Sequence, residues 1–287
     1  MGTRMTTYSI NAGRKLMDLS HPMVMGILNV TPDSFHKSVN PYGKDSCPII
    51  CETVRKMLSD GADVIDVGGC STRPDSRPVN SDEEWRRLSM ALETIRLNIP
   101  DCIVSVDTFR AEIAERCIRE YGVEIVNDIS GGDEDMYDLV SRESVPYILT
   151  YNESHLNRSH TVSVNEMPVC KRAMLFFSRR IQSLRDRGAK DIILDPGFGF
   201  NKTITENYEL LSHLNAFDML ELPILVGVSY KRMVYEVLGC THNEAANGTT
   251  AVNTMALMKG AKILRVHDVK AARECVRLWE IMTENAF

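Results

Sequence analysis

Short apolar runs rich in Val and Ile alternate along this chain with longer amphipathic segments. Each run is nearly continuous in apolar residues, as expected for parallel strands that are covered on both faces. The eight predicted strands are residues 24–30, 63–69, 102–108, 123–129, 146–151, 191–197, 223–229 and 262–268. Because helical patterns separate the runs, we predict a single-domain α/β fold, the (β/α)8 or TIM barrel.

The helical segments carry recognisable start signals. Ser81 and Glu84 have the spacing of a capping box, and an apolar face that includes Leu88 follows them. Thr203 and Glu206 repeat that spacing before another predicted helix. Long helices are also expected at about residues 167–187 and 269–282.

The barrel is expected to use residues 23–287, with residues 1–22 as an N-terminal lead-in that could form a hairpin at the barrel bottom. A doubly wound open sheet is the alternative. That fold usually has fewer units and a glycine-rich nucleotide turn, and its GxGxxG pattern is absent from the sequence.

Composition and charge narrow the function classes. The chain has 287 residues, of which 44% are hydrophobic and 25% charged, as in globular proteins. Its net charge is −6 with scattered Lys and Arg, which argues against a nucleic-acid or anionic-membrane surface. The eight cysteines form no CxxC or zinc spacing, and no apolar run approaches ~20 residues. A cytoplasmic protein with reduced thiols is therefore expected.

Polar side chains recur where the predicted strands end. In such a barrel the active site is built at the carboxyl ends of the strands. Seven of the eight strands deliver a polar or charged group there: Asn29; Ser71, Thr72 and Arg73; Asp107; Asn127 and Asp128; Asp195; Ser229 with Lys231; and Arg265 with His267. A single Asp or Asn after a strand is more often a helix cap. Seven such positions on one rim predict a binding site.

These residues divide by chemistry into two groups. The first comprises two carboxylates, an amide and an ammonium: Asp107, Asp195, Asn127 and Lys231. It suits a flat heterocycle with N–H groups along one edge, because a carboxylate can accept two parallel hydrogen bonds. The second group comprises Arg73, Arg265, His267 and Asn29. It suits a phosphate or pyrophosphate, and the Asn29 amide is also available to a hard cation.

The sequence resembles the dihydropteroate synthases, a pterin-binding family of (β/α)8 barrels. The matching stretches are GILNVTPDSF, DVGGCSTRP, SVDTFRAEIA, VNDISGG, LDPGFGFNKT, VGVSYKRM and GTTAVNTMALMKGAKILRVHDV, in the family's order. The resemblance implies a transferase of folate biosynthesis that needs Mg²⁺. Such an enzyme joins 6-hydroxymethyl-7,8-dihydropterin pyrophosphate to 4-aminobenzoate, giving 7,8-dihydropteroate and pyrophosphate. It also implies a homodimer and inhibition by sulfonamides.

The resemblance further implies roles for individual residues. The pterin pocket would comprise Asp107, Asn127, Asp195, Phe200 and Lys231. The pyrophosphate would bind Asn29, Arg73, Arg265 and His267, with Asn29 also touching the metal. The aminobenzoate would lie against Phe35, Thr72, Arg73, Pro74, Lys231 and Arg232. Asp107, Lys231, Arg265 and His267 would act in catalysis by electrostatic stabilisation, with no covalent enzyme intermediate.

Four stretches depart from the family's usual pattern. Cys70 replaces a Glu and Asp75 a Gly, the first loop continues as HKSVNPYG, strand five ends in Thr150, Tyr151 and Asn152, and Arg232 replaces a Ser. Arg232 could bind the aminobenzoate carboxylate or point to solvent. The alternatives are a pterin-binding paralogue with altered or lost activity and a methyltetrahydrofolate methyltransferase. The latter would leave Arg73, Arg265 and His267 with nothing to bind.

Overall fold

The chain folds around an eight-stranded parallel sheet. The computed structural model describes residues 8–13, 15–31, 46–70, 79–153 and 167–285. Its strands pair in the order β8-β7-β6-β5-β4-β3-β10-β9. A parallel bridge between Leu194 and Ile224 joins the two edges of this sheet and closes the barrel. The (β/α)8 prediction is therefore confirmed.

Each predicted strand overlaps an observed one, and in seven of the eight the observed strand lies within the predicted run. The barrel strands are β3 (Met23–Asn29), β4 (Val64–Gly68), β5 (Val104–Asp107), β6 (Ile125–Asp128), β7 (Tyr147–Thr150), β8 (Ile192–Asp195), β9 (Leu225–Val226) and β10 (Ile263–Val266). Seven of the predicted runs are longer because they include residues on both sides of the hydrogen-bonded ladder, whereas the run 24–30 is shifted by one residue from β3.

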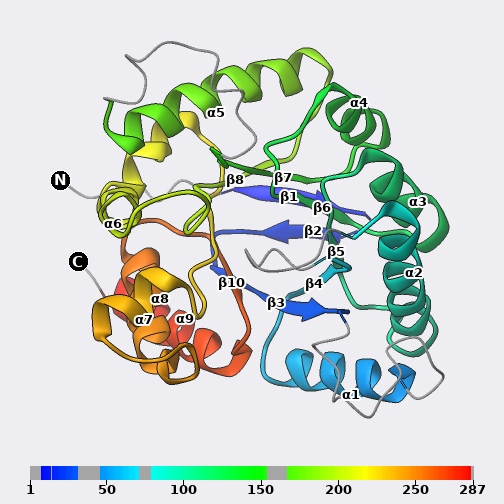
Figure 1. Cartoon of the computed structure of the whole chain (residues 1–287), viewed down its shortest axis with the longest axis horizontal. Coiled ribbons are helices and arrows are strands. Elements are labelled where there is room, and N and C mark those ends of the chain that lie inside the picture. The colour runs from blue at the N-terminus through cyan, green and yellow to red at the C-terminus, as the bar shows by residue number, and fades with distance from the viewer. Residues whose placement is uncertain (1–7, 14, 32–45, 71–78, 154–166, 286–287) are drawn as a thin grey trace.

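Helices surround the strands on the outside (Figure 1). They are α1 (Ser46–Ser59), α2 (Ser81–Asn98), α3 (Ala111–Tyr121), α4 (Glu134–Glu143), α5 (Val169–Asp186), α6 (Ile204–Ser212), α7 (Arg232–Leu238), α8 (Ala246–Met258) and α9 (Val269–Glu284). Two short 3-10 helices, η2 (Leu214–Leu220) and η3 (His242–Glu244), complete the described elements. None of the helices in the described ranges has the length and hydrophobicity that spanning a bilayer requires.

The helix starts test the two capping predictions. The Thr203 and Glu206 box is confirmed: Thr203 N donates to Glu206 Oε2 at 2.8 Å, and Glu206 N donates to Thr203 Oγ1 at 3.2 Å. The Ser81 box is wrong, because Asn80 is the cap and its Oδ1 accepts from Glu83 N at 2.9 Å. Glu84 is instead buried inside the protein, where other residues bind it.

The barrel interior changes from apolar to polar along six of its eight strands. At the strand starts the inward side chains form one apolar cluster that includes Met25, Val64, Ile103, Ile125, Ile148, Ile193, Leu225 and Ile263. Strand side chains alternate between faces, so positions two residues further on also point inward. At six of those positions the residues are Asp66, Ser105, Asn127, Thr150, Asp195 and Arg265. The period of two therefore builds a polar compartment above an apolar floor.

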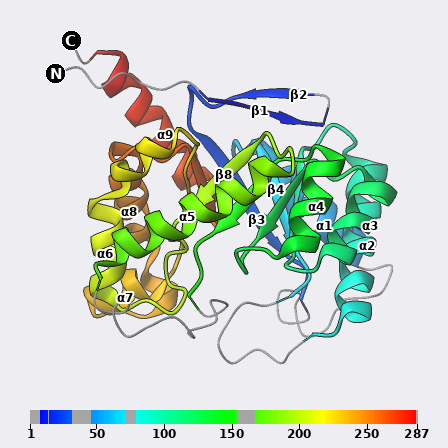
Figure 2. The same cartoon turned by 90° about the horizontal axis from the view of Figure 1, so that it is seen from above.

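An N-terminal hairpin covers the apolar end. Strands β1 (Ser9–Ala12) and β2 (Lys15–Asp18) pair antiparallel. Ile10, Ala12 and Met17 are buried and belong to the same apolar cluster as the strand starts. Figure 2 shows the hairpin across one end of the molecule. The expected hairpin at the barrel bottom is thus present, while the domain boundary at residue 22 stays a prediction.

Candidate active site

Arg265 lies at the centre of a charged cluster in the polar compartment. Its Nε donates to Asp66 Oδ2 at 2.6 Å, and its Nη2 donates to Asp107 Oδ2 at 2.6 Å. Asn127 Nδ2 donates to the same Asp66 oxygen at 3.0 Å. These four residues come from β10, β4, β5 and β6. The sequence analysis assigned Arg265 to the group of residues suited to phosphate. In the structure Arg265 also contacts Asp107 of the heterocycle group, so it connects the two groups.

Asp66 is a residue that the sequence analysis did not select. It is fully buried, and its Oδ1 has no hydrogen-bond partner among the described residues. Its Oδ2 holds both Arg265 and Asn127. The available signal was a carboxylate in the middle of the apolar run VIDVG, since buried carboxylates need a partner. Asp66 fixes the direction of the Arg265 guanidinium.

Asp107 has a proton affinity matched to neutral pH. Burial raises the pKa of Asp107 to about 7, and the nearby carboxylates of Asp66 and Glu84 act in the same direction. Arg265 opposes this rise in the pKa. Asp107 can therefore accept a hydrogen bond as a carboxylate, and its charge responds to the groups that a ligand brings beside it.

Asp195 and Lys231 form a second charged pair across the compartment. Asp195 Oδ1 accepts from Gly197 N at 2.8 Å. Burial raises the pKa of Asp195 and lowers the pKa of Lys231 to about 8, and in each case the opposite charge of the partner opposes the shift. Lys231 Nζ donates to Phe198 O and lies 4.8 Å from the centroid of the Phe200 ring. An ammonium, a carboxylate and an aromatic wall are thus brought together.

Asn29 lies beside Asp107 at the rim. Gly68 is in register with Asn29 on one side and with Asp107 on the other. A Cβ at Gly68 would lie 3.5 Å from Asn29 Oδ1 and 3.6 Å from Asp107 Cβ. The missing side chain leaves room between an amide oxygen and a carboxylate.

A magnesium ion bound to substrate phosphates fits these donors. Among the described residues, no group of three or more His, Cys, Asp or Glu could hold a metal ion. Mg²⁺ usually keeps several waters and takes one or two protein oxygens together with substrate phosphates. The Asn29 amide oxygen, which lies beside the Asp107 carboxylate, suits that arrangement.

His267 lies on the rim of the barrel, just before the start of α9. Its Nδ1 lies 3.1 Å from Ser229 Oγ, and its ring is 6.0 Å from the Tyr230 ring. It also lines an open cleft of about 680 Å³ between α1, η3 and the start of α9, together with Lys56 and His242. His267 is exposed, so its imidazole is accessible to a polar ligand at the mouth of the barrel.

The predicted second-substrate residues are placed only in part. Arg232 begins α7, is exposed, and forms an ion pair with Glu236 on the next turn, with 2.8 Å between Nε and Oε1. Its contact with a second substrate stays a prediction. Lys231, also predicted for that subsite, lies in the polar compartment beside Phe198 and Phe200. The other predicted residues, Phe35, Thr72, Arg73 and Pro74, lie outside the described residues.

Three residues at the end of β7, the fifth strand of the barrel, depart from the family pattern, and one of them lines the polar compartment. Thr150 is in register with Asp195, and its buried Oγ1 has no hydrogen-bond partner among the described residues. Tyr151 points the other way and packs against α5, with its ring centroid 5.3 Å from that of Phe176. Asn152 Nδ2 donates to Ile129 O at 2.9 Å. The departure at Thr150 therefore adds a hydroxyl to the compartment wall.

Cys70 lies beside a buried ion pair. Glu84 accepts from Thr108 Oγ1 at 2.6 Å and also binds Arg110, whose Nη1 is 3.8 Å from Cys70 Sγ. Burial raises the pKa of Cys70 to about 12. The thiol is therefore protonated at neutral pH, and the carboxylate in this corner comes from Glu84.

Comparisons with known proteins agree on one family. Residues 25–267 match the family model described as pterin binding enzyme. The dihydropteroate synthase of Haemophilus influenzae is 36% identical over 280 residues, which cover 96% of this chain and 98% of that protein.

Two solved structures of similar proteins contain bound ligands. The Thermus thermophilus dihydropteroate synthase in complex with 4-aminobenzoate aligns with a TM-score of 0.82 and 32% identity, over 96% of this chain and 100% of that one. The Yersinia pestis dihydropteroate synthase in complex with a sulfonamide drug aligns with a TM-score of 0.83 and 32% identity, over 97% and 100% of the two chains.

Proposed function

The chain belongs to the pterin-binding enzyme family, and on that premise we propose that it is a dihydropteroate synthase of folate biosynthesis. It condenses 6-hydroxymethyl-7,8-dihydropterin pyrophosphate with 4-aminobenzoate to 7,8-dihydropteroate and pyrophosphate. The observation that carries this conclusion is the buried cluster in which Asp66 and Asp107 hold Arg265. It lies in the same compartment as Asp195 and Lys231, which are opposite in charge and close enough to shift each other's pKa.

The polar compartment suits a dihydropterin ring. Asp195 uses Oδ1 for Gly197 N, and its other oxygen can accept from an N–H or amino group of the heterocycle. Asn127 and Lys231 can donate to its carbonyl and ring nitrogen atoms. The planar Arg265 guanidinium and the Phe200 ring offer flat surfaces for stacking. Polar recognition in a buried site gives specificity, because a ligand that lacks a partner group leaves a protein charge unpaired.

In the proposed reaction a C–N bond forms as a C–O bond breaks. The amine of 4-aminobenzoate attacks the methylene carbon of the pterin, the C–O bonding electrons leave with pyrophosphate, and the amine gives up one proton to water. Positive charge grows on the pterin side, where the Asp107 carboxylate offsets it. Negative charge grows on the leaving oxygen, where Arg265 and His267 stabilise it. Positioning and charge stabilisation suffice, without a covalent intermediate.

The metal and the second substrate belong to the proposal. Asn29 would hold Mg²⁺ together with the pyrophosphate, and the ion would further neutralise the charge of the leaving group. The aminobenzoate would lie against Lys231, with Phe35, Thr72, Arg73, Pro74 and Arg232 as further contacts implied by family resemblance. Sulfonamides would compete for this place. The 4-aminobenzoate and sulfonamide complexes of the related synthases support both statements.

We also propose a homodimer and a cytoplasmic location. Exposed apolar side chains gather on two helices that pack against each other: Met255 and Met258 on α8, and Leu278, Ile281 and Met282 on α9. The other side of α8 is buried, so this helix packs on its own barrel and still presents apolar side chains outward. All eight cysteines are free thiols, which supports a reducing compartment.

The test is product formation by the purified protein. With both substrates and Mg²⁺, we expect pyrophosphate and dihydropteroate in equal amounts, and none after chelation of the metal. Asp195→Asn should remove pterin binding and turnover, whereas Asp191→Asn at the opposite end of β8 serves as the matched control and should keep both. Pterin binding without either product would identify a non-catalytic paralogue. Methyl transfer from methyltetrahydrofolate would identify the methyltransferase.

A further inference from the structure

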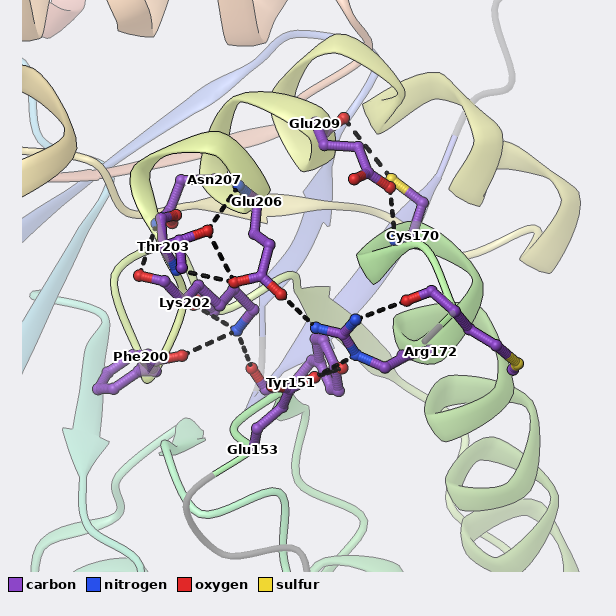
Figure 3. Close-up of polar contacts among 12 residues, drawn as sticks. Tyr151, Glu153, Cys170, Arg172, Phe200, Lys202, Thr203, Glu206, Asn207 and Glu209 are labelled. Atoms are coloured by element: carbon purple, nitrogen blue, oxygen red, sulfur yellow. Dashed lines mark hydrogen bonds and ion pairs between the residues drawn. The ribbon is translucent and has the colours of Figure 1, made fainter. Parts of the chain in front are cut away.

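Lys202 belongs to the loop between β8 and α6, and its side-chain nitrogen lies beside backbone oxygens of Tyr151 and Phe200 (Figure 3). It is 9% exposed, and its Nζ donates to three backbone carbonyls. The acceptors are Tyr151 O at 3.0 Å, Gly197 O at 2.8 Å and Phe200 O at 3.3 Å. One ammonium therefore ties the end of strand β7 to two points of the β8–α6 loop.

That loop has a backbone conformation that needs support. Gly197, Gly199 and Asn201 have φ values of +67°, +83° and +46°. Positive φ is uncommon for residues other than glycine, and Asn is one of the few that tolerate it. A Cβ at Gly197 would lie 2.1 Å from Tyr151 O, which is one of the carbonyls that Lys202 binds. The loop is thus held against β7 at the point where Lys202 joins the two.

The same loop shapes the proposed pterin pocket from its other side. Gly197 N donates to Asp195, and Phe198 O accepts from Lys231. The Phe200 ring lies below the Lys231 ammonium. Successive carbonyls of the loop therefore point in different directions: those of Gly197 and Phe200 to Lys202, and that of Phe198 to Lys231.

Two nearby glutamates and an aromatic ring stabilise the positive charge of Lys202 in its buried position. Its Nζ lies 4.5 Å from the centroid of the Tyr151 ring. Arg172 Nε binds Glu153 Oε1 at 2.7 Å, and its Nη2 binds Glu206 Oε1 at 2.6 Å. These two carboxylates favour the charged form of Lys202, while burial lowers its pKa to about 8. Figure 3 shows Arg172 between the two glutamates.

We propose that Lys202 is a positioning residue for pterin recognition, which holds the β8–α6 loop so that Asp195, Lys231 and Phe200 face the dihydropterin ring. Lys202 does not touch the substrate, because its ammonium is used by the three carbonyls. The inference rests on the proposed function. It extends that function by naming a residue outside the binding groups that sets the affinity for one of the two substrates.

The test compares two buried lysines. Lys202→Met keeps the aliphatic stem but removes the donor, and Lys202→Arg restores charge and donors. Lys262→Met is the matched control, since Lys262 is 8% exposed and precedes β10 at the apolar end of the barrel. Calorimetry with 6-hydroxymethyl-7,8-dihydropterin pyrophosphate gives Kd, steady-state kinetics give KM for each substrate and kcat, and thermal melts report stability.

We expect Lys202→Met to weaken pterin binding about tenfold or more, because small misplacements of positioned groups have large effects. KM for 4-aminobenzoate at saturating pterin should change less than the pterin Kd, because the two proposed subsites share Lys231 but not Asp195 and Phe200. Lys202→Arg should recover part of the pterin affinity, and Lys262→Met should lower Tm without changing pterin Kd. The effects of Lys202→Met and Phe200→Ala on Kd should be non-additive, since one acts through the other.

Two results would overturn the proposal. One is a folded Lys202→Met enzyme with pterin Kd within twofold of wild type, and the other is an equal loss of pterin affinity in Lys262→Met. If Lys202→Met does not fold, Lys202→Gln, which keeps one donor, takes its place under the same criteria. A wild-type protein that binds the pterin but forms no product would refute the synthase function alone, and the comparison of Kd values would still decide the role of Lys202.

Discussion

Replacing Asp66 by Asn tests the cluster at the centre of the site. The change keeps the shape of the side chain but removes the charge that Arg265 Nε contacts at 2.6 Å. An Asn oxygen in the place of Asp66 Oδ2 can still accept from Arg265 Nε and Asn127 Nδ2, but both bonds are weaker without the negative charge. Arg265 keeps its second partner, Asp107, while the contact that fixes its direction is weakened.

The burial of the Asp66–Arg265 ion pair sets the expected loss of stability in Asp66→Asn. Removing one partner of a buried ion pair typically costs about 3–5 kcal/mol of the free energy of unfolding. Because Asp107 still neutralises Arg265, we expect a smaller loss of about 2–3 kcal/mol, close to the value of a charged hydrogen bond. We also expect kcat/KM for the pterin substrate to fall about tenfold or more, since a tenfold change needs only about 1.4 kcal/mol.

The Asp66→Asn change also has a signature in the pH profile. The Asp66 carboxylate is one of the causes that raise the pKa of Asp107, so its removal should lower that pKa. The acid limb of kcat/KM should therefore move to lower pH. Urea unfolding, calorimetry and pH-dependent kinetics measure the three effects. Asp63→Asn is the control, because Asp63 also pairs with an arginine, Arg273, but at the start of β4. Wild-type affinity and an unshifted acid limb in Asp66→Asn would refute the reasoning.

The remaining predictions concern pH, the loop and the second substrate. Lys231 has a pKa of about 8 and should lose its charge as pH rises, so the pterin affinity of the wild type should fall above pH 8. Calorimetry across pH should show a smaller fall for Lys231→Arg. The pKa of Asp107 is raised to about 7 in the folded protein, so the folded state binds this proton more tightly than the unfolded state. The contribution of Asp107 to the free energy of unfolding should therefore decrease as pH rises from about 4 to 7, and Asp107→Asn should remove this slope from urea titrations. Gly197→Ala should destabilise the protein by about 2 kcal/mol or more and weaken pterin binding, because its φ is +67° and its Cβ would meet a backbone carbonyl; unchanged melting would contradict this. Arg232→Ala should leave pterin Kd unchanged and the free energy of unfolding within about 1 kcal/mol, because its ion pair with Glu236 is exposed; a shift in KM for 4-aminobenzoate alone would show that Arg232 reaches that substrate.

The sequence predicts the barrel well because apolar runs repeat. Eight Val- and Ile-rich segments are sufficient for eight parallel strands, and the ends of those strands predict the rim. The candidate residues Asp107, Asn127, Asp195, Lys231 and Arg265 converge for that reason. Where the prediction depends on periodicity, it is confirmed.

The prediction is weaker where partners come from distant segments. Asp66 lies within an apolar run, and its role emerges only when Arg265, 199 residues away in sequence, is placed beside it. Lys202 binds a carbonyl 51 residues away and has no sequence pattern that indicates this. The Ser81 capping box is wrong because an equally good cap, Asn80, precedes it, and spacing alone does not choose between them.

The central claim is that the polar compartment of the barrel binds the dihydropterin and its rim binds the pyrophosphate. The most direct measurement is a crystal structure of the protein soaked with 6-hydroxymethyl-7,8-dihydropterin pyrophosphate and Mg²⁺. We predict the pterin ring within hydrogen-bond distance of Asp107, Asn127 and Asp195, and the pyrophosphate beside Asn29 and His267. A pterin ring bound outside the barrel, with the bonds from Arg265 to Asp66 and Asp107 unchanged and nothing beside Asp195, would contradict the account.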